Sequence, residues 1–237
     1  MSRAEALYAI AAAGANVLGA IAVVTRARWS LRALDYMLSL AAGFLISVAV
    51  LELFPEAIAR GGTSGAVVVL IAYLLVHLTQ HTLGRHFHFG EETHEVSQLV
   101  SVSALLGLLL HTFVDGVAVA SGLRVSEALG ALVFGAVLLH KFPEGLAISS
   151  LFLAAGASRR SALLAAVALG IATILGVLLT DQLAFLREYG LAIAAGVTLY
   201  VGASNLVPEF QAKRGWGIPF SFLVGCGLYF AARSLAR

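Results

Sequence analysis

Apolar residues follow one another in long runs along this chain, and polar residues gather in short segments between the runs. A run of about 20 apolar residues is long enough for a helix to cross the hydrocarbon core of a bilayer. Counting such runs predicts eight membrane-spanning helices. They cover residues 4–25, 33–58, 64–83, 97–121, 126–153, 161–180, 189–210 and 216–234. We therefore expect an all-α integral membrane protein with a single transmembrane transporter domain over residues 1–237.

The composition agrees with this expectation. Hydrophobic residues make up 60% of the chain and charged residues 12%, whereas soluble domains have about 45–50% apolar and about 25% charged residues. The net charge of +2 gives no reason to expect a nucleic-acid partner, so the expected surroundings are a lipid bilayer. The first apolar run extends from Ala6 to Thr25, which is longer than the hydrophobic part of a signal peptide and indicates a membrane helix.

The positions of Lys and Arg predict the orientation, because short cytoplasmic loops carry an excess of these residues. The loops after the first, third, fifth and seventh spans hold Arg26, Arg28, Arg32, Arg85, Arg159, Arg160, Lys213 and Arg214. The other loops hold Arg60, Arg124 and Arg187, and the termini on that side add Arg3, Arg233 and Arg237. The loops favour an orientation with both termini extracytoplasmic and loop 84–98 cytoplasmic, and the expected location is the plasma (inner) membrane.

One short motif occurs twice inside the apolar runs. Residues 111–118 read HTFVDGVA and residues 140–147 read HKFPEGLA, so both copies follow His-x-Phe-x-acid-Gly-x-Ala. Residues four apart share a helix face, which places His111 beside Asp115 and His140 beside Glu144. Ionisable residues are costly within a membrane and mark functional sites there. The alternative is that the four side chains bond to one another and merely hold two helices together.

The four side chains predict a metal site if the two copies face each other. Two imidazoles and two carboxylates suit Zn²⁺, with Fe²⁺, Mn²⁺, Co²⁺ and Cd²⁺ as competing ions. Gly116 and Gly145 follow the acids directly, and small residues there would let the two backbones approach or would serve packing alone. Pro143 is expected to kink the second motif helix and free the carbonyl oxygen of Leu139.

Lys141 lies near the middle of its span, too deep to reach the membrane surface easily. We expect its ammonium to neutralise carboxylate charge from Asp115, Glu144 or Glu52. The alternative is a lysine that lines a water-filled pore without a specific partner.

A second repeat joins two other spans. Residues 43–56 read GFLISVAVLELFPE and residues 196–209 read GVTLYVGASNLVPE, with five of the fourteen aligned positions identical. The two spans cross the membrane in opposite directions, so the pattern indicates an inverted repeat in a 3+2+3 arrangement, with the two motif helices in the centre. Many secondary transporters have such repeats, with a ligand site near the midplane. Chance similarity between apolar helices is the alternative.

Further polar residues suggest a path for ions. Glu52, Glu56, Asn205 and Glu209 occupy matched repeat positions and are candidates for a relay between the site and water, although Glu56 and Glu209 also suit the ends of helices at the interface. Five histidines lie at or after the end of the third span and are candidates for metal capture, or are incidental to a solvated loop. They are His77, His81, His86, His88 and His94.

Taken together, these motifs resemble the ZIP family of zinc- and iron-type metal transporters. Members carry a His-Asn-Phe-x-acid-Gly type motif in helix 4 and a His- or Gln-containing motif with Pro, an acid and Gly in helix 5. Residues 111–116 (HTFVDG) and 140–145 (HKFPEG) resemble these motifs, and the Pro-Glu ends of spans 2 and 7 also look like family features. The resemblance implies eight helices, uptake toward the cytoplasm and a metal site of His111, Asp115, His140 and Glu144. Some relatives have a second metal site, whose positions are Thr112 and Lys141 here. A cation at a ligand position implies a centre for one metal ion.

The function expected from these features is zinc uptake by alternating access, without enzymatic activity. A cation-diffusion exporter also uses His-x-x-x-Asp on two helices, but such exporters usually have six spans. An intramembrane zinc hydrolase would need an open coordination position, and there is no His-Glu-x-x-His motif. A metal-stabilised structural protein is a further alternative. The sequence does not fix the oligomeric state, and a homodimer is one arrangement that it allows.

Overall fold

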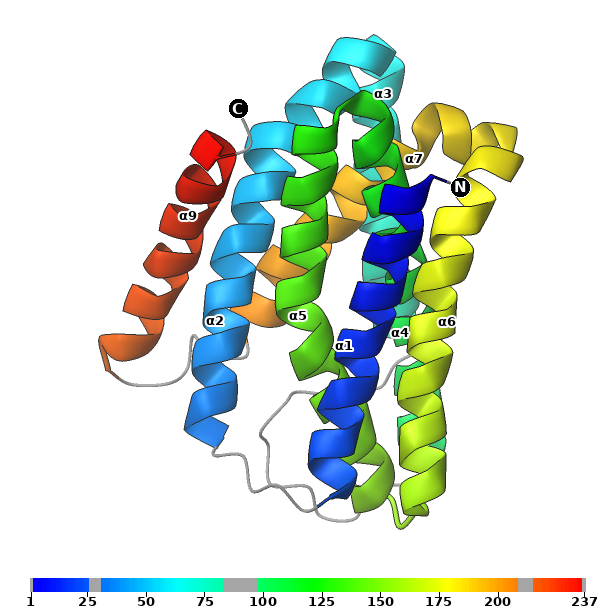
Figure 1. Cartoon of the computed structure of the whole chain (residues 1–237), viewed down its shortest axis with the longest axis vertical. Helices are drawn as coiled ribbons and strands as arrows, with labels where there is room; N and C mark the ends of the chain where they lie inside the picture. Colours follow the sequence, from blue (N-terminus) through cyan, green and yellow to red (C-terminus); the bar gives the residue numbers. More distant parts are fainter. Residues whose placement is uncertain (1, 26–30, 83–97, 209–214, 236–237) are drawn as a thin grey trace.

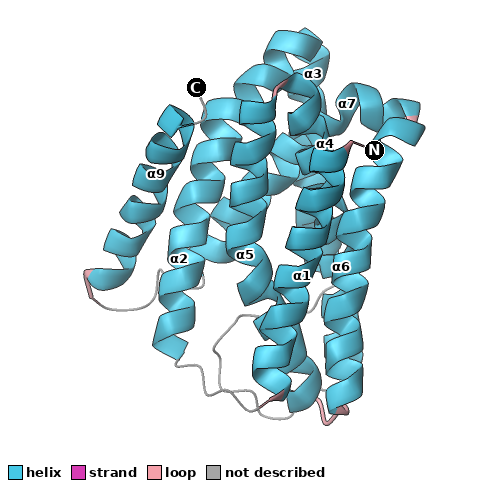
Figure 2. Ribbon diagram, in the orientation of Figure 1, coloured by secondary structure: helices cyan, strands magenta, loops and turns pink. Residues whose placement is uncertain are grey.

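The computed structural model describes residues 2–25, 31–82, 98–208 and 215–235, and all regular elements in these ranges are helices (Figure 2). The prediction of an all-α fold is therefore confirmed. In chain order the helices are α1 (Arg3–Val24), α2 (Leu31–Val48), η1 (Ala49–Leu53), α3 (Phe54–Thr82), α4 (Gln98–Val125), α5 (Glu127–Ala154), α6 (Arg159–Gln182), α7 (Ala184–Tyr200), η2 (Val201–Leu206) and α9 (Gly217–Leu235). The elements η1 and η2 are π-helices.

The described residues contain seven helices that are long and apolar enough to cross a membrane, one fewer than expected. The second and third expected spans form one helical run of 48 residues from Arg32 to Thr79. This run turns at Gly62, whose φ of 52° and ψ of −137° lie outside helical geometry (Figure 1). Glycine adopts positive φ without the steric cost that a side chain would add. The run therefore has two arms, and these correspond to the two expected spans.

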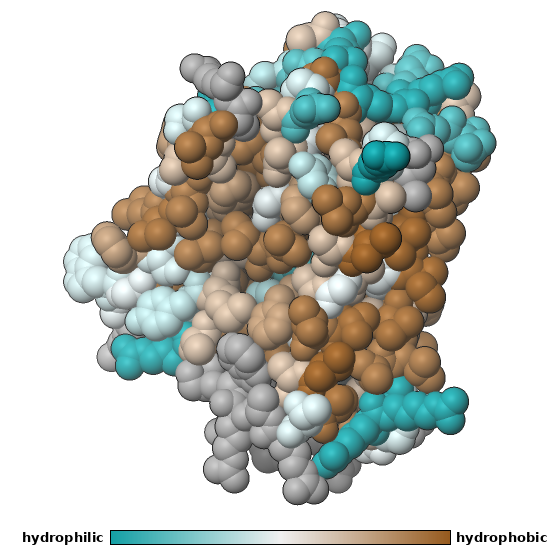
Figure 3. All heavy atoms as spheres, in the orientation of Figure 1, coloured by the Kyte–Doolittle hydropathy of each residue, from teal (hydrophilic) through white to brown (hydrophobic). Residues whose placement is uncertain are grey.

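The surface matches that of a protein surrounded by lipid. Hydrophobic side chains cover the middle of the face in Figure 3, and hydrophilic ones gather toward its two ends. Large apolar side chains such as Leu106 and Phe220 are 63% and 67% exposed. A soluble monomer rarely exposes a contiguous apolar surface of this kind. The chain is thus a multi-pass membrane protein, and the start of α1 and the end of α9 lie toward the same end of the molecule (Figure 1).

Three apolar clusters hold the helices together among the described residues, and α5 takes part in the two larger ones. The largest joins residues of α2, α3, α4, α5 and α7, with Leu45, Val133 and Val197 among its buried members. The second joins α1, α5 and α6 through Ala20, Ile148 and Leu169. Because α5 contributes to both of these clusters, the second motif is carried by a helix that is enclosed by the others.

Close contacts between helices occur in pairs that the inverted repeat relates. Gly43 of α2 packs against the carbonyl oxygen of Phe222 in α9, and Gly196 of α7 packs against the carbonyl oxygen of Val69 in α3. The inverted repeat relates α2 to α7 and α9 to α3, so the first of these contacts is the counterpart of the second. The same holds for Gly145, which packs on Asn16 of α1, and Gly116, which packs on Thr173 of α6.

The last pair of contacts differs from the expectation that Gly116 and Gly145 draw α4 and α5 together. Each glycine instead contacts a helix outside that pair. Gly116 contacts α6, and Gly145 contacts α1. The reason is that adjacent residues of a helix do not face the same way, so a glycine directly after a ligand lies on another face. Pro143 lies inside α5, which continues as one helix from Glu127 to Ala154.

The two π-helices occupy equivalent places in the repeated segments. Leu53 ends η1 and Leu206 ends η2, and these two leucines are aligned in the repeat. A π-helix accommodates an extra residue in a turn, and such turns are frequent at functional sites. The repeat is therefore preserved in local backbone geometry as well as in sequence.

Candidate metal centre

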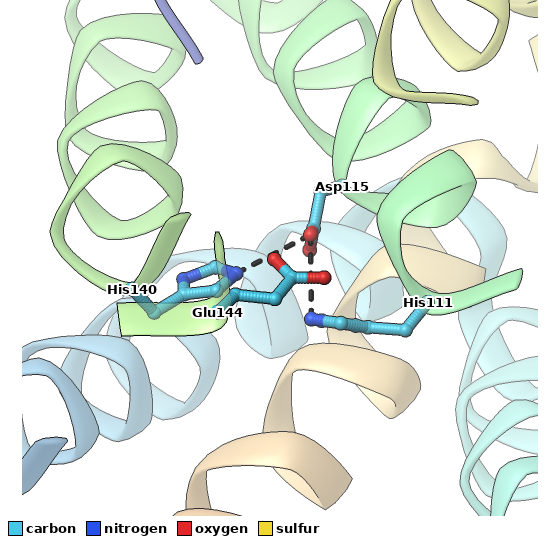
Figure 4. A group of neighbouring side chains, drawn as sticks. All are labelled: His111, Asp115, His140 and Glu144. Atoms are coloured by element: carbon cyan, nitrogen blue, oxygen red, sulfur yellow. Dashed lines mark hydrogen bonds and ion pairs between the residues drawn. The ribbon is translucent and has the colours of Figure 1, made fainter. Parts of the chain in front are cut away.

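Four side chains from the two motifs meet between α4 and α5. His111 and Asp115 extend from α4, His140 and Glu144 extend from α5, and all four turn toward one another (Figure 4). One ligand atom from each residue lies within 4.8 Å of the others, and all four residues are buried. Ligand atoms bound to zinc at about 2.1 Å lie no more than about 4.2 Å apart, so small side-chain shifts would complete a coordination shell.

Asp115 is at the centre of this group. Its Oδ2 lies 3.3 Å from Nε2 of His111 and 3.3 Å from Nε2 of His140. The same oxygen lies 2.6 Å from Nζ of Lys141. One carboxylate oxygen thus faces two imidazole nitrogens and one ammonium, which makes it the point where both motifs meet.

The ring of His140 is oriented by the backbone. Its Nδ1 lies 2.9 Å from the carbonyl oxygen of Ala136, and because a carbonyl only accepts, Nδ1 is the donor. A neutral ring then has its lone pair on Nε2, which faces Asp115. A hydrogen bond at the far nitrogen is the usual way in which proteins fix a metal-binding imidazole. The geometry therefore presents Nε2 of His140 as a ready ligand.

His111 is held differently. Its Nδ1 is buried and has no hydrogen-bond partner among the described residues. The two imidazoles lie near each other, with ring centroids 5.4 Å apart and planes inclined by 34°. The two motifs are thus alike in sequence but unequal in how firmly their rings are positioned.

Lys141 lies beside the four candidate ligands and is 0% exposed. Its Nζ is 2.6 Å from Asp115 Oδ2 and 2.7 Å from Glu144 Oε2. Thr112 Oγ1 lies 2.7 Å from Glu144 Oε1 and 2.6 Å from the carbonyl oxygen of Leu108, so its single proton can serve either acceptor. Both oxygens of Glu144 therefore have a donor within the protein.

Glu52, the third carboxylate considered for Lys141, bonds elsewhere. Tyr229 donates its hydroxyl proton to Glu52 Oε1 at 2.6 Å, and Nε of Arg233 lies 2.9 Å from the same oxygen. These contacts join η1 to α9. No pattern along the chain links α9 to η1, because the contact spans 177 positions.

The other candidates for an ion path lie apart from these contacts or outside the described residues. Glu56 is paired with Arg60 at 2.6 Å on α3. Asn205 is half-buried on η2, and Glu209 lies outside the described residues. The relay stays a prediction.

The histidines proposed for metal capture are mostly beyond what the structure describes. His77 lies on α3, with its ring edge-on to Tyr200 at 5.9 Å between centroids. His81 lies near the end of α3, but its side chain is outside the described part, and so are His86, His88 and His94. Metal capture by loop 84–98 also stays a prediction.

Asn16 is a buried polar residue that the sequence analysis missed. It is 0% exposed, and neither its Nδ2 nor its Oδ1 has a hydrogen-bond partner among the described residues. Its backbone packs against Gly145, the residue after Glu144. The sequence does contain a signal for this residue, because Asn16 is a polar amide inside the first apolar run.

Comparison with known proteins adds the family. The model of the ZIP zinc transporter family matches residues 77–231, about two thirds of the 237-residue chain. No curated protein matches the chain. The matched region contains both copies of the His-x-Phe-x-acid-Gly motif. The chain therefore belongs to the ZIP zinc transporter family, whose members carry zinc and other divalent metal ions across membranes and are not enzymes.

Proposed function

We propose that this protein takes up Zn²⁺ toward the cytoplasm by alternating access around one metal site near the midplane. The ligands in this proposal are His111, Asp115, His140 and Glu144. The observation that carries it is the gathering of these four buried side chains from two motifs, with ligand atoms within 4.8 Å of one another.

The donor set supports zinc as the substrate. Two imidazole nitrogens and two carboxylate oxygens are ligands that Zn²⁺ accepts in tetrahedral sites. Fe²⁺, Mn²⁺, Co²⁺ and Cd²⁺ are competing substrates in this proposal, because the same donors bind other divalent ions. The single cysteine, Cys226, is on α9 and is not part of the group, so the site offers no thiolate to softer ions.

The orientation and the mechanism rest on further observations. The excess of Lys and Arg in alternate loops favours an orientation with loop 84–98 in the cytoplasm and both termini outside. A location in the plasma membrane is part of this proposal. Alternating access is supported by the inverted repeat and by its paired helix contacts, since such repeats rock against each other in many transporters. The inward direction is supported by the family resemblance alone.

Zinc entry into liposomes that hold the purified protein tests the proposal. We expect saturable entry with the wild-type chain and its loss in the double variant Asp115→Asn, Glu144→Gln, which keeps the side-chain shapes. Glu127→Ala is the matched control, because Glu127 is an exposed glutamate on the same helix as Glu144. Entry by a folded double variant at the wild-type rate would show that the buried group does not carry the metal.

A further inference from the structure

We propose that Lys141 is a tethered counter-cation, which occupies the two carboxylates while the site holds no metal and is displaced from Asp115 when Zn²⁺ binds. This inference rests on the proposed function and specifies how the same site is loaded and emptied. Lys141 contributes to the net charge of the site in both the empty and the zinc-bound state.

The contacts of Lys141 are made with oxygens that the metal needs. Its ammonium approaches Asp115 Oδ2 to 2.6 Å and Glu144 Oε2 to 2.7 Å, and the side chain is 0% exposed. A Zn²⁺ ion bound to the same two carboxylates would lie within a few ångströms of Nζ. Repulsion between an ammonium and a divalent ion at that distance is much larger than thermal energy away from bulk water. The ammonium therefore has to withdraw as the metal enters.

The arrangement favours withdrawal from Asp115 rather than from Glu144. Lys141 and Glu144 lie three residues apart on α5, whereas Asp115 belongs to α4. The flexible stem of a lysine lets its ammonium move while the backbone stays in place. Asp115 is also the carboxylate that faces both imidazoles, so its oxygen is the one that the metal would share with His111 and His140.

The charge of the site follows from this exchange. With neutral imidazoles, two carboxylates and one ammonium leave one negative charge on the empty site. One Zn²⁺ turns it into one positive charge. Without Lys141 the empty site would carry two negative charges in a buried position, where unpaired charges are costly. The lysine thus lowers the affinity for zinc, which aids release of the ion. It also lets the empty transporter return to the state that binds a new ion.

Removal of the ammonium is the direct test. In Lys141→Gln we expect the Kd for Zn²⁺, measured by titration of the purified protein, to fall by at least about tenfold, because the competing cation is gone. We also expect net Zn²⁺ uptake into liposomes to slow, while exchange of labelled Zn²⁺ for unlabelled Zn²⁺ continues. Exchange needs only the loaded site to move, whereas net uptake needs the empty site to return.

Thr112→Val is the matched control. Thr112 Oγ1 lies 2.7 Å from the other oxygen of Glu144, the same distance as Lys141 Nζ from Glu144 Oε2, but it carries no charge. Its loss removes no positive charge from the site, so the Kd is not expected to fall. A fall in Kd that equals the fall in Lys141→Gln would assign the effect to hydrogen bonding of Glu144 and overturn the counter-cation.

Two unpaired carboxylates could prevent Lys141→Gln from folding, so a second comparison uses one carboxylate fewer. The Kd of Glu144→Gln is compared with that of the double variant Glu144→Gln, Lys141→Gln, and we expect tighter binding in the double variant. An equal or weaker affinity there, or in Lys141→Gln itself, overturns the proposal. Wild-type protein that neither binds nor admits Zn²⁺ would instead refute the proposed function, on which this inference rests.

Discussion

Gly145 packs directly on the backbone of Asn16. A Cβ atom at Gly145 would overlap the carbonyl oxygen of Asn16 and approach its carbonyl carbon to 2.8 Å and its Cα to 3.0 Å. Glu144 precedes Gly145, so the place where α1 meets α5 is one residue from a proposed metal ligand. The contact has a counterpart in Gly116 and Thr173, where α6 meets α4 beside Asp115. Asp115 and Glu144 are each followed by a glycine that packs closely on a neighbouring helix, and this packing positions the acid.

Gly145→Ala tests this positioning. The added methyl meets backbone atoms, which cannot rotate away, so α1 must shift from α5. Overpacking of this kind costs about 1–3 kcal/mol. We expect a lower thermal unfolding temperature in detergent and slower zinc entry into liposomes. Gly107→Ala on α4 is the control, because nothing lies within 4 Å of a Cβ there, and equal stability of the two variants would contradict the argument.

The two imidazoles should contribute unequally to zinc binding. The ring of His140 is fixed by its bond to Ala136, whereas His111 has no such bond at Nδ1 among the described residues. A ligand that is already oriented loses less freedom when it binds. We expect His140→Ala to raise the Kd for Zn²⁺ more than His111→Ala does, with both variants measured by the same titration. An equal or reversed order would show that the backbone bond does not preorganise the site.

The helices and the motif were the predictable part of this protein. Long apolar runs predict membrane helices because the bilayer fixes the length of a crossing segment. Spacing of four residues places His111 with Asp115 on one helix, and the structure brings this pair next to the pair on α5. The count of separate helices was harder to predict, since the glycine-rich stretch around Gly62 turns within a continuous helical run.

Contacts between distant segments were not predictable from patterns along the chain. The π-helices leave no mark in hydrophobic periodicity, and the direction of Gly116 and Gly145 depends on which helices surround α4 and α5. From the sequence alone, three carboxylates were candidate partners for the ammonium of Lys141. The structure places its ammonium against Asp115 and Glu144, because Glu52 lies against α9.

Tyr229→Phe tests the contact between η1 and α9. Tyr229 is 0% exposed, and its hydroxyl donates to the carboxylate of Glu52 at 2.6 Å. Hydrogen bonds to charged groups contribute about 1.5–3 kcal/mol. We expect a loss of stability within or somewhat below this range, because Arg233 still pairs with Glu52. Differential scanning fluorimetry of the detergent-solubilised variant would measure it.

Tyr8→Phe is the control for this change, since Tyr8 stacks on Phe134 through its ring, at 4.2 Å between centroids, and the stack survives the substitution. We expect little change in its unfolding temperature. The Kd for Zn²⁺ should stay at the wild-type value in Tyr229→Phe. A large change in Kd together with unchanged stability would place Glu52 in the ion path rather than in an anchor for α9.

Asn16→Leu addresses the buried amide of α1. Both polar atoms of this side chain lack a partner among the described residues, and a buried polar group without one costs about 1–3 kcal/mol. Leucine has a similar size and no polar atoms, so we expect a higher unfolding temperature. Thr173→Val at the counterpart contact is the control, because the Thr173 hydroxyl has an acceptor in Leu169 and its removal should give no gain. A loss of stability in Asn16→Leu would show that the amide is hydrogen-bonded in the membrane-embedded protein, and a loss of zinc entry at unchanged stability would add Asn16 to the transport path.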